Sequence, residues 1–163
     1  FKLILGDHEP WAGEVHVWGV DAAQLAPQAR RRFVGHVDQA FRAVPGTVAD
    51  QITLGDPGIS REEMTQAAQL AGIGSALEAL PQGYDTPYAE GLLSQGQTQL
   101  LSIARAVAAN PKLLLLDEIT ANLDSGTEQQ VMEALRRASQ NRAVLSISHR
   151  LYEQSGQGRI VQI

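Results

Sequence analysis

Residues 113–118 constrain the fold of this chain more than any other stretch. Four consecutive leucines, Leu113–Leu116, are followed directly by the carboxylates Asp117 and Glu118. Such an apolar run suits a strand that is buried on both faces, as in a parallel sheet covered by helices. Ligands of open α/β sheets bind at the carboxyl edge of the strands. An aspartate there can hold Mg²⁺ and a neighbouring glutamate can polarise an attacking water. The plainer interpretation is a buried strand that leaves the core through a polar turn.

Strands and helices alternate along the rest of the chain. The pattern predicts further strands at 14–18, 33–37, 143–147 and 159–163. It predicts helices that begin at the capping boxes Ser60–Glu63 and Ser125–Glu128, and a helix from Ser94 to about Asn110, before Pro111. Alternation of this kind predicts an α/β fold with a parallel sheet flanked by helices.

Residues from about 40 to 110 are mostly helical in pattern and predict a helical subdomain inserted into an α/β core formed by 1–39 and 111–163. The 163 residues correspond to one domain by length. Phe1–Gly6 read as the tail of a helix that a glycine stops. Because domains rarely begin at the end of a helix, we expect the chain to lack its natural beginning.

Charge and cysteine content narrow the class of protein. The net charge of −5 gives no basic surface for a nucleic-acid partner. The chain has no cysteine, which excludes disulfides and thiolate chemistry and is compatible with a reducing compartment.

Polar residues follow three of the predicted strands: Gln39, the pair Asp117 and Glu118, and His149. On a parallel sheet they would project from one edge around a single ligand. Each residue alone is weak evidence for a ligand site, because a glutamine after a strand is usually part of a surface turn and a lone histidine is usually structural. Together with Leu93–Gln97 between them, they form a specific pattern.

This pattern resembles the ATP-binding cassette (ABC) family. Five motifs carry the resemblance in the family's order: Val37–Gln39 resembles the Q-loop, Leu93–Gln97 the signature LSGGQ, Leu113–Glu118 the Walker B motif, Ala121–Asp124 the D-loop and Ser148–Arg150 the H-loop. The resemblance implies a partial P-loop NTPase-type sheet, with the signature motif on the helical insert.

The resemblance also implies roles for these residues. Glu118 would orient or activate the hydrolytic water, and His149 would contact the γ-phosphate of ATP. Asp117 and Gln39 would serve Mg²⁺. The signature residues would contact ATP held by a second subunit, and Asp124 would act across that interface; the signature set is Ser94, Gln95, Gly96 and Gln97. A helix that begins at Ser94 agrees physically, because free N–H groups and the positive dipole end attract phosphate.

Two further stretches resemble exporters within the family. Pro45–Ile52 is similar to the segment that follows the exporter Q-loop, and Tyr84–Gly91 to the exporter stretch YDTxVGERG. Glu90 holds the position of the glutamate that contacts the membrane domain. The resemblance implies an ATPase that powers export on the cytoplasmic side of a membrane. Its partners would be a second nucleotide-binding domain, identical or different, and a transmembrane domain.

The chain departs from the family in lacking the phosphate loop. Its two lysines, Lys2 and Lys112, do not stand in such a motif, so we expect no ATPase activity from these 163 residues alone. Gln95 replaces the first glycine of the signature and could crowd a phosphate. These departures keep open a degenerate module that dimerises without hydrolysis. A soluble family member acting on DNA or ribosomes is disfavoured by the charge and by the Glu90 stretch.

Overall fold

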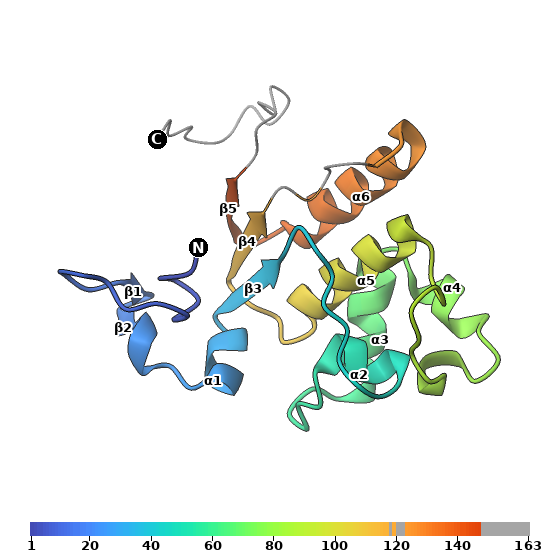
Figure 1. The fold of residues 1–163 in the computed structure, drawn as a ribbon, viewed down its shortest axis with the longest axis horizontal. Coiled ribbons are helices and arrows are strands. Elements are labelled where there is room, and N and C mark those ends of the chain that lie inside the picture. Colours follow the sequence, from blue (N-terminus) through green and yellow to red (C-terminus); the bar gives the residue numbers. More distant parts are fainter. Residues whose placement is uncertain (118, 120–122, 148–163) are drawn as a thin grey trace.

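The computed structural model describes residues 1–117, 119 and 123–147. Its centre is a parallel three-stranded sheet in the order β3–β4–β5 (Figure 1), formed by Val34–Val37, Leu113–Asp117 and Ala143–Ile147. The sheet confirms the α/β prediction, and β5 has the predicted bounds. The predicted strand at 159–163 lies outside the described residues.

The two faces of the sheet are covered differently. Val37, Leu114 and Leu116 belong to a large core with residues of α3 (Arg61–Leu70), α5 (Gln95–Val107) and α6 (Ser125–Ala138). Val34 and Leu115 pack instead with residues from the N-terminal segment. Side chains alternate between faces along a strand, which explains this division. Gly35 allows α5 to lie directly against β3, since a Cβ there would come within 3.0 Å of the Ala106 carbonyl oxygen.

The N-terminal segment forms a small antiparallel hairpin of β1 (His16–Val17) and β2 (Val20–Asp21), followed by η1 (Ala22–Gln24) and α1 (Pro27–Arg31). The predicted strand at 14–18 is shorter than expected, because Trp18 and Gly19 form the hairpin turn with φ of 51° and 80°. Residues 1–6 contain one helical turn, with Leu5 N donating to Phe1 O at 3.0 Å, rather than an assigned helix.

Helices fill the chain between β3 and β4, in the order α2 (Val48–Thr53), α3 (Arg61–Leu70), α4 (Gly74–Glu78), η2 (Gly83–Asp85) and α5 (Gln95–Val107). The capping box at Ser60 and Glu63 is confirmed, and Gly72 follows α3 with φ of 79°. α5 begins after Ser94 as predicted and ends three residues before Asn110. No helix among the described residues is long and apolar enough to cross a membrane.

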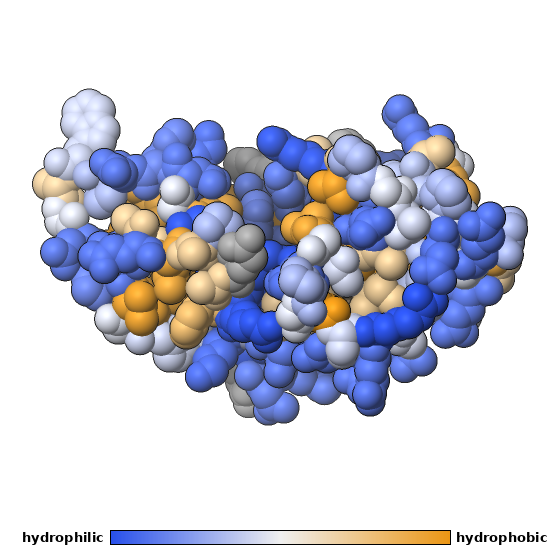
Figure 2. All heavy atoms as spheres, turned by 90° about the horizontal axis from the view of Figure 1, so that it is seen from below, coloured by the Kyte–Doolittle hydropathy of each residue, from blue (hydrophilic) through white to orange (hydrophobic). Residues whose placement is uncertain are grey.

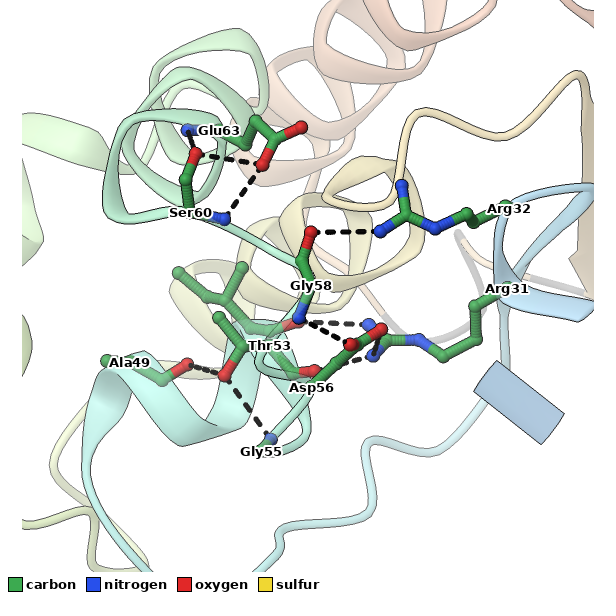
Figure 3. Close-up of polar contacts among 10 residues, drawn as sticks. Arg31, Arg32, Ala49, Thr53, Gly55, Asp56, Gly58, Ser60 and Glu63 are labelled. Atoms are coloured by element: carbon green, nitrogen blue, oxygen red, sulfur yellow. Dashed lines mark hydrogen bonds and ion pairs between the residues drawn. The ribbon is translucent and has the colours of Figure 1, made fainter. Parts of the chain in front are cut away.

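Two arginines at the end of α1, Arg31 and the C-cap residue Arg32, attach these helices to the sheet side of the molecule (Figure 3). Arg31 donates to the carbonyl oxygens of Ile52 and Thr53, and Arg32 donates to Gly58 O at 2.9 Å. Arg31 also lies 3.8 Å from the carboxylate of Asp56. These contacts fix the end of α2 and the α2–α3 loop against α1.

Candidate functional site

Two predicted site residues lie at the carboxyl edge of the sheet. Asp117 is the last residue of β4 and pairs with Ile147, the last residue of β5. Val37 pairs with Leu116, so Gln39, an exposed residue two positions beyond β3, follows at the same edge. Glu118 and His149, predicted for this edge, lie outside the described residues.

Two neighbours of Asp117 were missed by the sequence analysis. His36, Asp38 and Asp117 each offer a ligand atom, and these atoms lie within 4.8 Å of one another. The register explains the grouping, because His36 pairs with Leu115 and therefore shares a sheet face with Asp117. The alternation rule applied to both strand ends would have found them. Burial lowers the pKa of His36, so its imidazole is neutral near pH 7.

These side chains fit a hard divalent cation. Mg²⁺ takes oxygen ligands, which the carboxylates of Asp38 and Asp117 supply. Asp38 also lies 3.8 Å from the Arg42 guanidinium, a pair that is exposed and therefore weak. The Mg²⁺ role of Asp117 and Gln39 remains a prediction, with the Asp38 carboxylate as a further oxygen donor beside Asp117.

The start of α5 is a separate polar site. Ser94 Oγ accepts from Gln97 N at 3.2 Å, and Ser94 N donates to Gln97 Oε1 at 2.9 Å. This capping box occupies the side chains of both residues. The N–H groups of Gln95 and Gly96 have no partner among the described residues, as expected in the first turn of a helix. Two free donors at the positive end of a 13-residue helix can bind an anion.

Gly96 faces α6 (Ser125–Ala138) at close range. A Cβ on Gly96 would come within 3.0 Å of Thr127 Cγ2, so the starts of α5 and α6 lie side by side. Asp124 is the N-cap of α6, and the prediction of Ser125 as N-cap was wrong. The Asp124 carboxylate accepts from Gly126 N at 3.1 Å, Thr127 N at 3.0 Å and Thr127 Oγ1 at 2.6 Å, more donors than a serine hydroxyl could satisfy.

Hydrogen bonds from Thr127 lower the pKa of Asp124, so this residue is ionised at neutral pH. Its carboxylate carries a full negative charge beside the start of α5. The predicted role of Asp124 across an interface therefore concerns a side chain that already caps its own helix.

The two exporter-like stretches lie next to each other. Val48 N donates to Thr86 O and Tyr88 N to Gly46 O, each at 2.9 Å. The bidentate pair of Arg61 and Asp85, at 3.1 and 3.0 Å, ties the second stretch to α3. Glu90 is exposed just beyond this pairing.

The sheet edge and the start of α5 lie apart in the molecule (Figure 1). Seen from below, hydrophilic and hydrophobic side chains are mixed in the middle of the molecule (Figure 2). A hollow of about 380 Å³ is lined by residues of α1, β3, α5 and the segment after Gln39; its charged lining residues are Asp7, Arg30, Arg31, Asp38, Arg42 and Arg105.

Comparisons with known proteins give one consistent answer. The family model described as ABC transporter matches residues 1–121. An uncharacterized ABC transporter ATP-binding protein, YfiC, of Bacillus subtilis is 41% identical over 152 residues, covering 92% of this chain and 25% of YfiC. The ATM1-type heavy metal exporter of Novosphingobium aromaticivorans is 38% identical, with 92% and 25% covered.

A solved structure agrees with these sequence matches. It is described as a bacterial Atm1-family ABC exporter with ATP bound, and it superposes with a TM-score of 0.74 at 37% identity. The match covers 92% of this chain and 27% of that chain. The chain therefore spans about a quarter of the length of these relatives.

Proposed function

Because this chain belongs to the ABC transporter family, we propose that in its complete protein it binds and hydrolyses ATP to drive export across a membrane. The observation that carries the proposal is the presence of two separate polar sites. Acidic oxygen donors gather at the carboxyl edge of the sheet, and free helix N–H groups stand at the start of α5. The first site suits a cation and the second an anion, as the two charges of Mg²⁺ and ATP require.

Each site contributes through named residues. At the sheet edge, Asp117 and Gln39 hold Mg²⁺, which neutralises charge on the phosphates when bound. Glu118 orients the attacking water as a general base, and His149 contacts the γ-phosphate. These assignments give the edge its catalytic role, in a core of residues 1–39 and 111–163.

The start of α5 acts on nucleotide held by a second subunit. Gln95 and Gly96 N–H groups, preorganised by the Ser94–Gln97 capping box, donate to the phosphate. The separation of this helix end from the edge of its own sheet supports an action in trans (Figure 1). Asp124, beside it, lies at the same interface. The second subunit is another nucleotide-binding domain, and the helical insert spans about residues 40–110.

The membrane domain binds near Glu90. This side chain is exposed, and the stretch that carries it is paired with the Gly46–Thr47 turn, which follows Gln39 by only a few residues. A partner that presses on Glu90 would therefore reach the nucleotide side of the fold through short connections. We propose that the domain lies on the cytoplasmic side of the membrane.

Glu118→Gln in the complete protein tests the proposal. The amide is close in shape but cannot accept the proton of water, so ATP binding persists and turnover is lost. Phosphate release measures turnover, and size-exclusion chromatography measures whether ATP holds two nucleotide-binding domains together. Glu78→Gln, which changes an exposed glutamate of α4, is the matched control and keeps wild-type turnover. An unchanged hydrolysis rate in Glu118→Gln would refute the catalytic assignment.

Mixed dimers test the direction of the contact. One subunit carries Ser94→Arg, which blocks the helix start, and the other carries Glu118→Gln. In trans, one composite site keeps both Ser94 and Glu118, so the mixed dimer is active while both homodimers are inactive. A dimer with one wild-type and one Glu118→Gln subunit first measures whether one intact site can work alone. If that dimer is active and the mixed dimer assembles but is inactive, the arrangement in trans is contradicted. If both are inactive, the two sites are strictly coupled.

A further inference from the structure

The segment that follows Gln39 is held by one arginine of α5. Arg105 donates from Nη1 to Arg42 O at 2.7 Å and from Nε to Gln51 O. Its guanidinium carbon lies 4.1 Å from the centroid of the Phe41 ring, a cation–π contact. Arg105 thus grips the two residues Phe41 and Arg42, which lie two and three positions after Gln39.

Gln51 of α2 holds the same segment through Val44. This side chain is fully buried. Its Oε1 accepts from Val44 N at 2.9 Å and from Arg105 Nη2 at 3.3 Å, and its Nε2 donates to Val44 O at 2.7 Å. Every polar atom of the buried amide therefore has a partner, which makes the arrangement specific in geometry. The path from α5 to the segment after Gln39 consists of charged and amide hydrogen bonds.

The same helix carries the anion-binding start at its other end. Arg105 follows Ser94 by 11 positions, which corresponds to about 16 Å along a helix. A helix of this length moves as a rigid element, so a displacement at Ser94 reaches Arg105. Desolvation lowers the pKa of Arg105 to about 10, and the side chain remains a cation at neutral pH.

We propose that Arg105 is a positioning residue that couples the α5 helix to Gln39, so that contact of nucleotide with the Ser94 end places Gln39 at the carboxyl edge of the sheet. The proposal rests on the proposed function, because the role of Gln39 is taken from it. Arg105 acts through residues 41–44, by its contacts with the Phe41 ring and Arg42 O and by the bonds of Gln51 to Val44.

The test is a double-mutant cycle in the complete transporter, read as kcat and KM for ATP hydrolysis. Arg105→Met keeps the apolar stem and removes every donor. We expect kcat to fall about tenfold with KM for ATP within about twofold, because positioning is lost and not binding. In a Gln39→Ala background the same change should have no further effect, so the cycle shows a coupling of at least about fivefold.

Arg142→Met is the matched control. Arg142 also donates to two carbonyl oxygens and one side-chain amide oxygen: Pro111 O at 3.0 Å, Ala138 O at 2.8 Å and Asn110 Oδ1 at 2.8 Å. It lies far in sequence from Gln39 and holds the end of α6. If the removal of any structural arginine lowers kcat, Arg142→Met will lower it as well. Its effect on kcat should be independent of Gln39→Ala, so that the two fold-changes multiply in the double variant. Arg105→Lys, which keeps the charge on a single donor nitrogen, should give an intermediate kcat.

Amide hydrogen exchange without nucleotide gives a readout independent of turnover. Residues 40–44 should exchange faster in Arg105→Met than in wild type, and at the wild-type rate in Arg142→Met. Unchanged exchange in Arg105→Met, or independent effects of Arg105→Met and Gln39→Ala on kcat, would overturn the proposal. If the wild-type protein does not hydrolyse ATP, or if its hydrolysis does not depend on Glu118, the proposed function is refuted instead. The exchange rates would still show whether Arg105 holds residues 40–44.

Discussion

Replacing Gly96 by alanine should loosen the contact between the starts of α5 and α6. The new Cβ would lie less than 3.0 Å from Thr127 Cγ2, whereas carbon atoms in good contact are about 3.5–4.0 Å apart. Thr127 cannot turn away freely, because its hydroxyl donates to Asp124 Oδ2 at 2.6 Å in the cap of α6. Either the cap breaks or the two helices move apart.

Two opposing effects set the magnitude. Overpacking of this kind costs about 1–3 kcal/mol. Alanine favours the helix over glycine by up to about 1 kcal/mol, less at this second helical position than in a helix interior. The free energy of unfolding should therefore fall by about 1–2 kcal/mol, which in a domain of this size lowers Tm by roughly 2–4 °C for each kcal/mol.

Thr127→Ser provides the rescue. It removes Cγ2 and keeps the hydroxyl, so the Gly96→Ala methyl would next meet Thr127 Oγ1 at 3.5 Å and Cβ at 3.6 Å, which are ordinary contacts. Thermal unfolding of the chain with all four combinations measures the pair. The double variant should recover most of the loss, with a favourable interaction energy of about 1–2 kcal/mol. Additive losses would show that the two residues do not meet, and a stabilised Gly96→Ala would refute the close approach itself.

Two further predictions follow from the site. The purified 163-residue chain should release no phosphate from ATP, because it contains no phosphate loop to hold the β- and γ-phosphates; turnover of ~1 s⁻¹ or more would contradict this. Asp124 has a lowered pKa, so its stabilising effect is present above the ordinary carboxyl pKa and is lost as the pH falls through the lowered value. The Tm difference between wild type and Asp124→Asn should accordingly stay constant from about pH 5 to 8 and shrink below about pH 4. If this Tm difference is the same at every pH, the ionisation of Asp124 is not its cause.

Short-range chemistry made most of the helices and strands predictable. The capping box at Ser60 and the helix start at Ser94 depend only on residues close in sequence, and the structure contains both. The buried run at β4 is equally local, since four leucines require cover on both faces. The Ser125 assignment was wrong because Asp124 stands next to it, and a carboxylate that accepts three donors outcompetes a hydroxyl in capping the helix.

Contacts between distant positions could not be read from one sequence. Gly96 meets Thr127, and Arg105 meets Arg42 and Gln51, across 31, 63 and 54 positions. Nothing local to either partner indicates such a pair. The grouping of His36, Asp38 and Asp117 differs, because strand alternation and the register between β3 and β4 would have been enough to find it.

The end of α2 is where the two parts of the molecule meet. Its last three carbonyl oxygens, on Gln51, Ile52 and Thr53, all accept from arginines: the first from Arg105 of α5, the other two from Arg31 of α1. Carbonyl groups in the last turn of a helix lack intrahelical partners, and cations suit that negative end. Arg31 of α1 and Arg105 of α5 therefore hold the same end of this short helix. Since Gln51 also fixes Val44, the orientation of α2 sets the segment after Gln39, and a movement of α5 relative to α1 must change one of these two sets of bonds.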